Sequence, residues 1–180
     1  MKQLVTIFFL FISLTLFSQE DEEINGFYYK ISLATTLTIN EEYTITNDDD
    51  TGPLILPSAF FVNNTFGYRF DERSVIGLNL EYNWHSESGL HFFPIHMSFR
   101  YNIIADDDNV FIRSGYGRLL KLGKSFESGT MYKVGAGVEI FNEDYTNSFL
   151  IGLDFSRKRF GYKQLDKLSS IAIFFEFMLF

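Results

Sequence analysis

Large apolar residues alternate with small or polar residues along most of the chain, a period-two pattern that predicts β-strands with one apolar face. In the clearest segment, Leu78 and Leu80 share one face, and Asn79 and Glu81 share the other. A helix would not keep this alternation over about a dozen residues. The alternating segments, eight in all, are 27–39, 59–70, 75–85, 91–103, 110–120, 130–141, 148–156 and 169–180.

The connections between these segments differ in length and charge. Three short acidic turns are expected at one end of the strands: 71–74, 105–109 and 142–147. Three longer loops are expected at the other end: 40–58, 121–129 and 157–168. The remaining connection, 86–89, is as short as a turn. Short turns opposite longer loops are typical of outer-membrane barrels. The expected fold is therefore all-β: an eight-stranded antiparallel up-and-down transmembrane β-barrel with a polar, plugged lumen.

Residue size distinguishes the two faces of the expected barrel. One face carries nearly all of the Phe, Tyr, Trp, Ile and Leu, and the other carries Gly, Ser, Asn, Thr and charges. The interior of an eight-stranded barrel is narrow, so we expect the small and polar face to point inward. The inverse arrangement, a soluble lipid-binding barrel with an aromatic pocket, is the alternative that the alternation alone leaves open.

The inward face collects cations and anions that must pair in so narrow a space. These residues are Lys30, Arg69, Glu81, Arg100, Arg113, Lys133, Glu139, Asp154 and Glu176. We expect them to form an ion-pair network that plugs the lumen, rather than to line a conducting path, because eight strands leave room only for side chains.

Composition agrees with a membrane barrel and excludes several other classes of protein. Aromatic residues make up 18% of the 180 residues, a proportion that suits a protein with aromatic belts. The mean hydropathy lies near zero, as expected when apolar and polar residues alternate. The formal net charge of −8 argues against nucleic-acid binding. The chain has no cysteine, which excludes disulfides and thiolate metal sites.

The N-terminal region has the pattern of a secretory signal peptide. Lys2 precedes an apolar run of 14 residues from Leu4 to Phe17, and the small residue Ser18 follows. This run is too short to span a bilayer comfortably as a helix. An uncleaved anchor helix is the alternative. The expected organisation is a signal peptide at 1–18, a short leader at 19–26 and an outer-membrane barrel at 27–180.

His96 and Ser98 are the one pair that invites comparison with a catalytic site. They lie two residues apart on one strand face, and small outer-membrane lipid A deacylases carry a His-x-Ser pair with a Glu. That chemistry needs the pair near the lipid, whereas the alternation turns both residues into the lumen, with no acid nearby to orient the His. We therefore expect no catalytic residue, no cofactor and no metal. The acidic run at 48–50 is expected to be a solvated loop rather than a calcium site.

The expected loops at 121–129 and 157–168 are basic. If they face outward, their cations could contact lipopolysaccharide phosphates, whereas plain solubility of exposed loops is the alternative. The residues expected to make this contact are Lys121, Lys124, Arg157, Lys158, Arg159 and Lys163.

Segments such as FPIHMSFRYNI (93–103) and GYGRLL (115–120) resemble small outer-membrane β-barrel proteins of Gram-negative bacteria. The resemblance is to the OmpA-transmembrane and OmpX-like size class, especially the outer membrane beta-barrel domain common in Bacteroidetes. It covers about 27–180, and it implies insertion by the barrel-assembly machinery and no enzyme activity.

We therefore expect a monomeric, non-enzymatic barrel in the cell outer membrane, in contact with outer-membrane lipid and lipopolysaccharide. Its role would be structural, envelope-stabilising or surface-binding. The alternatives are a lipid-modifying enzyme that uses His96 and Ser98, and a soluble lipid-binding barrel.

Overall fold

The computed structural model describes residues 25–39, 55–86 and 89–180. The expected signal peptide, most of the leader and the acidic run at 48–50 lie outside these residues. Within them, regular structure is almost entirely β, and no helix is long and apolar enough to cross a membrane. The elements are β1 (Gly26–Ile39), β2 (Ile55–Arg69), β3 (Ser74–His85), β4 (Leu90–Phe92), β5 (Pro94–Ile104), β6 (Asp108–Leu119), β7 (Gly129–Phe141), β8 (Asn147–Phe160), the 3-10 turn η1 (Tyr162–Gln164) and β9 (Asp166–Leu179).

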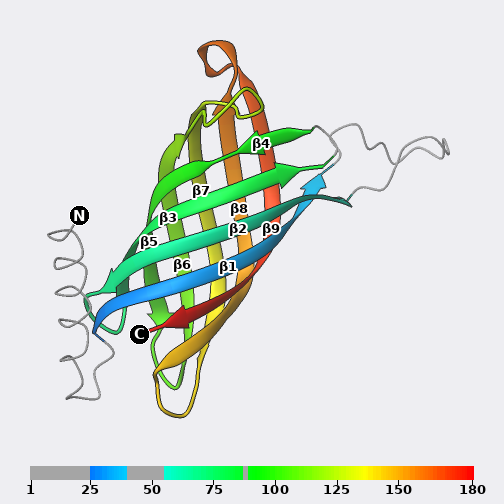
Figure 1. Ribbon diagram of the computed structural model, residues 1–180. Coiled ribbons are helices and arrows are strands. Elements are labelled where there is room, and N and C mark those ends of the chain that lie inside the picture. The colour runs from blue at the N-terminus through cyan, green and yellow to red at the C-terminus, as the bar shows by residue number, and fades with distance from the viewer. Residues whose placement is uncertain (1–24, 40–54, 87–88) are drawn as a thin grey trace, which may run out of the picture.

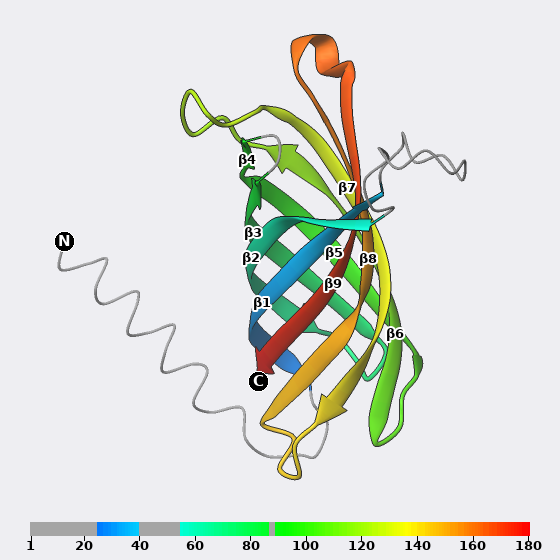
Figure 2. The same ribbon diagram turned by 90° about the vertical axis from the view of Figure 1, so that its right-hand side faces the viewer.

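The strands form a closed antiparallel ring (Figures 1 and 2). Apart from the short β4, each strand pairs with its two neighbours around the ring, and β1 pairs with both β2 and β9, which closes the sheet. β4 and β5 both pair with β3 and are separated only by Phe93, so they form one interrupted strand. The nine labelled strands therefore make eight positions around the ring, which confirms the predicted eight-stranded up-and-down barrel.

Two predicted loop boundaries are wrong. The segment 40–58 was expected to be a loop, but β2 begins at Ile55. The segment 157–168 was expected to be a loop, but β8 continues to Phe160 and β9 begins at Asp166. Arg157 to Phe160 pair with β9 in register, and Figure 2 shows the resulting β8–β9 hairpin rising above the rest of the barrel. The charges in this segment suggested a loop. Their side chains nevertheless alternate between the inner and outer faces, as do those of the earlier residues of β8. Backbone pairing on both sides of β8 keeps the strand extended.

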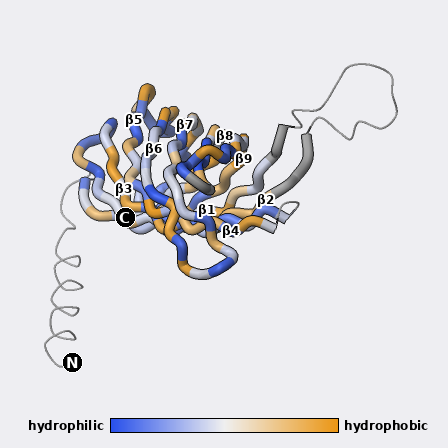
Figure 3. The backbone as a smooth tube through the Cα atoms, turned by 90° about the horizontal axis from the view of Figure 1, so that it is seen from above, coloured by the Kyte–Doolittle hydropathy of each residue, from blue (hydrophilic) through white to orange (hydrophobic). Residues whose placement is uncertain are grey.

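The outer wall is apolar, and the charges lie inside. Phe66, Met97 and Phe149 on the outward face are each more than half exposed, whereas Glu81 and Glu139 are fully buried. Figure 3 shows the hydrophilic and hydrophobic positions alternating along the strands. This arrangement is the reverse of a water-soluble barrel, which buries its apolar face.

The interior is less polar than the sequence suggested. Small and polar residues were expected there, yet five aromatic rings of the described residues are also buried inside: Tyr28, Phe61, Phe92, Phe111 and Phe174. Tyr28, Phe111 and Phe174 pack in one apolar cluster with Val75, Leu150 and Met178.

Glycines on the inner wall make room for these rings. A side chain at Gly77 would collide with the Tyr28 hydroxyl, and a side chain at Gly152 would collide with the Phe174 ring. The small residues of the inward face therefore accommodate large rings from other strands, which a single-strand pattern does not show.

Candidate functional site: the charged interior

The interior near the short turns is organised by Glu139 on β7. Its Oε2 accepts a hydrogen bond from Arg69 Nη2 at 2.8 Å and lies 3.1 Å from Arg100 Nη2. Asn109 donates to the same oxygen at 2.9 Å, and Ser148 donates to Oε1 at 2.8 Å. One buried carboxylate is thus held by two cations and two neutral donors, which compensates for its removal from water.

The C-terminus packs against this group. The guanidinium of Arg69 lies 4.9 Å from the ring centroid of Phe180 and 5.4 Å from that of Phe141. Phe180 also donates its backbone N–H to the carbonyl of Thr146 at 3.1 Å. β9 ends at Leu179, so Phe180 departs from the strand alternation and covers the turn end of the ion-pair group.

A second group lies farther into the barrel. Arg113 donates two hydrogen bonds to Asp154, at 2.8 and 2.6 Å, and two to Glu176, at 2.8 and 2.9 Å. Lys30 donates to Glu176 at 2.6 Å. The guanidinium of Arg113 also lies 3.7 Å from the centroid of the Phe174 ring. The planar guanidinium joins β6 to β8 and β9 in this way.

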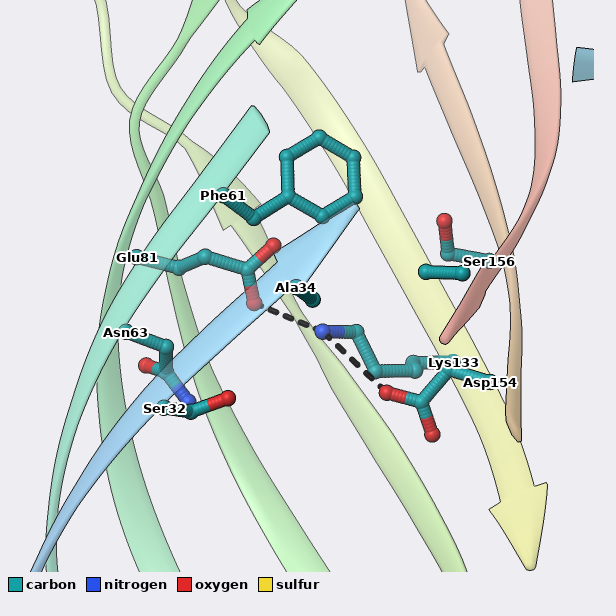
Figure 4. Close-up of a pocket in the computed structure, with 9 residues that line it drawn as sticks. Ser32, Ala34, Phe61, Asn63, Glu81, Lys133, Asp154 and Ser156 are labelled. Carbon is teal, nitrogen blue, oxygen red and sulfur yellow. Dashed lines mark hydrogen bonds and ion pairs between the residues drawn. The ribbon is translucent and has the colours of Figure 1, made fainter. Parts of the chain in front are cut away.

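Lys133 joins this group to β3. Its Nζ lies 2.6 Å from Glu81 Oε2 and 3.7 Å from Asp154 Oδ2, and Figure 4 shows it between the two carboxylates. The structure thus places all nine charged residues of the expected network inside the barrel. They form two separate ion-pair groups, one of three residues around Glu139 and one of six around Arg113.

Little space remains between these side chains. A cavity of about 10 Å³ is lined by Ser32, Asn63, Glu81 and Lys133, among others. A second, of about 30 Å³, extends past Asn79 and is also lined by Asn63 and Lys133. Because one water molecule needs about 10 to 15 Å³, these cavities suit one or two waters each. Neither cavity can admit a substrate of the size of a lipid or sugar.

His96 and Ser98 do not form a catalytic pair in the described part of the chain. Ser98 accepts a hydrogen bond from Asn79 at 2.8 Å, and His96 Nδ1 has no hydrogen-bond partner there. Both side chains face the lumen, and His96 is buried. Asn79 also accepts hydrogen bonds from Asn63 and Thr65, so it is a polar centre of the interior, which the alternation of a single strand does not reveal.

Lys158 was expected to contact lipopolysaccharide, and this prediction is wrong. Its side chain is fully buried inside the barrel, because β8 continues past Ser156 and the alternation turns Lys158 inward. The ammonium lies 4.6 Å from the Phe61 ring centroid and 5.4 Å from that of Phe92. It has no hydrogen-bond acceptor among the described residues.

The other cations of the expected lipopolysaccharide contact lie at the loop end. Lys121, Lys124, Arg159 and Lys163 are exposed, and Arg157 is half-buried on the outer wall. They do not form a single cluster in the chain: two lie in the β6–β7 loop, two on β8 and one in the β8–β9 turn.

These features define a closed, eight-stranded antiparallel β-barrel with an apolar outer wall and a charged, filled interior. No protein-family model and no curated protein matches the chain. Among solved structures, the chain is similar to Neisserial surface protein A, with 13% identity and a TM-score of 0.61 over 86% of this chain and 96% of that one. It also aligns with the N-terminal β-barrel domain of Pseudomonas aeruginosa OprF, with 11% identity and a TM-score of 0.48 over 86% of this chain and 99% of that one. At these identities the first likeness establishes the fold alone.

Proposed function

We propose that this chain is an integral outer-membrane β-barrel with a structural, envelope-stabilising or surface-binding role and no enzymatic activity. The observation that carries the proposal is the reversed distribution of polarity on a closed ring of strands. Exposed Phe, Ile, Leu and Tyr side chains cover the outer wall, while the ion pairs lie inside. Such a wall is stable only against an apolar solvent, and a closed barrel satisfies its backbone hydrogen bonds there.

The outer membrane is the compartment that best fits the remaining features. The expected signal peptide would direct export, and the barrel-assembly machinery would insert the chain as a monomer. Aromatic side chains such as Trp84 and Tyr82 are exposed near the loop ends, where interfacial belts lie. Membership of the outer membrane beta-barrel domain common in Bacteroidetes is part of the same proposal.

The filled interior favours a structural role over transport or catalysis. The ion pairs bridge the walls, and the cavities between them suit only isolated waters. A lipid-modifying enzyme would need a nucleophile and a base at the lipid surface, whereas His96 and Ser98 face inward.

The test is the mobility of the full-length expressed protein from purified outer membranes on SDS gels, unboiled and boiled. We expect a shift between the two samples, because a closed barrel resists SDS until it is heated. Recovery in the soluble periplasmic fraction, without a shift, would contradict the proposal and favour the soluble lipid-binding barrel.

A further inference from the structure

The strand register gathers cations from separate parts of the sequence on one side of the outer wall. Arg118 on β6 is paired with Thr130 on β7, Thr130 with Arg159 on β8, and Arg159 with Lys167 on β9. Directly paired residues in antiparallel strands project from the same face with their Cβ atoms about 5 Å apart. The three cations are exposed and form a row, which we call the cationic row.

The wall below the cationic row changes character step by step. Two residues down each strand, Tyr116 is paired with Tyr132 and Tyr132 with Arg157. Tyr116 is 65% exposed and Tyr132 39% exposed, so both rings face outward. Two residues farther down, Val134 is paired with Phe155 and Phe155 with Ile171. The order from wall to rim is therefore an apolar level, a level of Tyr rings with Arg157, and the cationic row.

This order matches the layers of a membrane leaflet. The apolar residues lie where acyl chains would be, the Tyr rings lie where the interface would be, and the cations lie at the level of the headgroups. No ion pair joins Arg118, Arg159 or Lys167 to a carboxylate of the described residues. Asp166, the nearest acid in sequence, alternates with Lys167 on β9 and so points to the other face.

Among the described residues at the loop end, the exposed cations lie on β6, β8 and β9 and in the loops that join β6 to β9. At the loop end of β2 and β3, the outward residues of the described chain are Phe60, Tyr82 and Trp84, which carry no charge. At the opposite end of the barrel, the exposed turns of the described residues carry several acids, such as Asp71 and Glu72, and one exposed cation, Arg73. General solubility alone would not favour one half of one rim for the exposed cations of the described residues.

We propose that the cationic row binds the phosphate groups of an anionic lipid in the outer leaflet, with the acyl chains against the apolar wall below. This inference rests on the proposed membrane function. It makes the cationic row, in place of the loop lysines, the main contact with lipid phosphate. Arg118 and Arg159 can each donate two hydrogen bonds to a phosphate, and Lys167 adds a point charge. The ligand class is a phosphate monoester on a membrane lipid, such as the lipid A part of lipopolysaccharide.

The test compares two triple variants that remove the same number of positive charges. The full-length protein, purified in nanodiscs of phosphatidylcholine doped with bisphosphorylated lipid A, is analysed for retained lipid A by native mass spectrometry. R118Q/R159Q/K167Q removes the cationic row. K121Q/K124Q/K163Q removes loop lysines and is the control. We expect the first variant to lose lipid A affinity by on the order of a hundredfold, at about a factor of five for each cation, and the control to keep most of it.

Other outcomes would overturn the proposal. Equal losses in both variants would mean that the contact is non-specific attraction to the rim, and no loss in either would mean that the wall does not bind phosphate. Displacement of lipid A by inorganic phosphate at matched ionic strength would mean a free-anion site rather than a lipid site. The mobility of boiled and unboiled samples is measured in parallel. A retained shift together with no lipid A binding would mean that only the lipid site is wrong, whereas a lost shift would mean that the membrane barrel itself is wrong.

Discussion

Arg69 on β2 and Glu139 on β7 form an ion pair across the full width of the barrel, with 2.8 Å between Nη2 and Oε2. In the ring β1, β2, β3, β5, β6, β7, β8, β9, these strands are separated by four steps in either direction, so they lie on opposite walls. Two side chains are long enough to meet across the interior, which means that the lumen has the width of a side-chain pair.

Removal of Glu139 is expected to destabilise the barrel more than removal of Arg69. Glu139→Gln leaves two buried guanidinium groups, Arg69 and Arg100, without their shared carboxylate, and we expect a loss of about 3 to 5 kcal/mol. Arg69→Met leaves Glu139 with Arg100 as partner and is expected to cost less. Urea unfolding from lipid vesicles, followed by fluorescence of the single tryptophan, Trp84, measures both.

Glu143→Gln is the control for this comparison, because Glu143 lies exposed in the β7–β8 turn. Its free energy of unfolding should match that of the unmodified protein. A cost for Glu139→Gln as small as that of Glu143→Gln would mean that the buried network contributes nothing to stability.

Lys133 and Lys158 should respond in opposite ways to replacement by Met, although both are interior lysines. Lys133→Met leaves Glu81 without its ion-pair partner, so we expect destabilisation of about 3 to 5 kcal/mol. Lys158→Met removes an ammonium that has aromatic rings but no hydrogen-bond acceptor around it, and we expect neutral or increased stability. The same urea titration measures both variants, and strong destabilisation by Lys158→Met would contradict this account.

The sequence was sufficient for the ring and for the identity of the charged interior, because both depend on alternation. Glu81, Lys133 and Glu176 fall on the inward face by counting alone. Which cation meets which anion could not be predicted, since Lys133 and Glu81 are 52 residues apart and meet only through barrel closure. Lys158 was misplaced for a local reason: four consecutive residues, three of them charged, suggested a loop, but pairing with β7 and β9 extends the strand.

Gly77→Ala is expected to strain the interior because of the ring opposite it. A Cβ atom at this position would lie 2.7 Å from both the Tyr28 hydroxyl and Thr65 Cγ2, so the neighbours must shift, at a cost of about 1 to 3 kcal/mol. Adding Tyr28→Phe removes the hydroxyl and should recover part of that stability. It also removes the Tyr28 hydrogen bond to the Ile76 carbonyl, worth about 1 kcal/mol.

A double-mutant cycle in the same unfolding assay measures this coupling. Gly123→Ala, in the β6–β7 loop, is the control, since its nearest neighbour would lie at 3.9 Å from the new Cβ. Additive effects of Gly77→Ala and Tyr28→Phe would show that the ring does not press on the glycine.

The filled lumen should not conduct ions. Cavities of about 10 and 30 Å³ each have room for only one or two waters, so we expect no stepwise current when the purified barrel is added to a planar bilayer. A large porin inserted into the same bilayer is the positive control. Steady single-channel steps from the barrel would mean that the ion pairs open in the membrane.

Asp71 is expected to titrate at lower pH than an ordinary aspartate because of the turn that it closes. Its Oδ1 accepts hydrogen bonds from the backbone N–H of Arg73 at 2.8 Å and of Ser74 at 2.6 Å, and these bonds hold its pKa below the ordinary value of 3.8. Since the pKa is lower in the folded than in the unfolded protein, the stabilisation is fully present above the unfolded value. It is lost as the pH falls through the folded value. A carboxyl NMR titration of the refolded protein, with Asp71→Asn for assignment, measures this pKa directly. A value at or above 3.8 would mean that the two backbone bonds do not persist in solution.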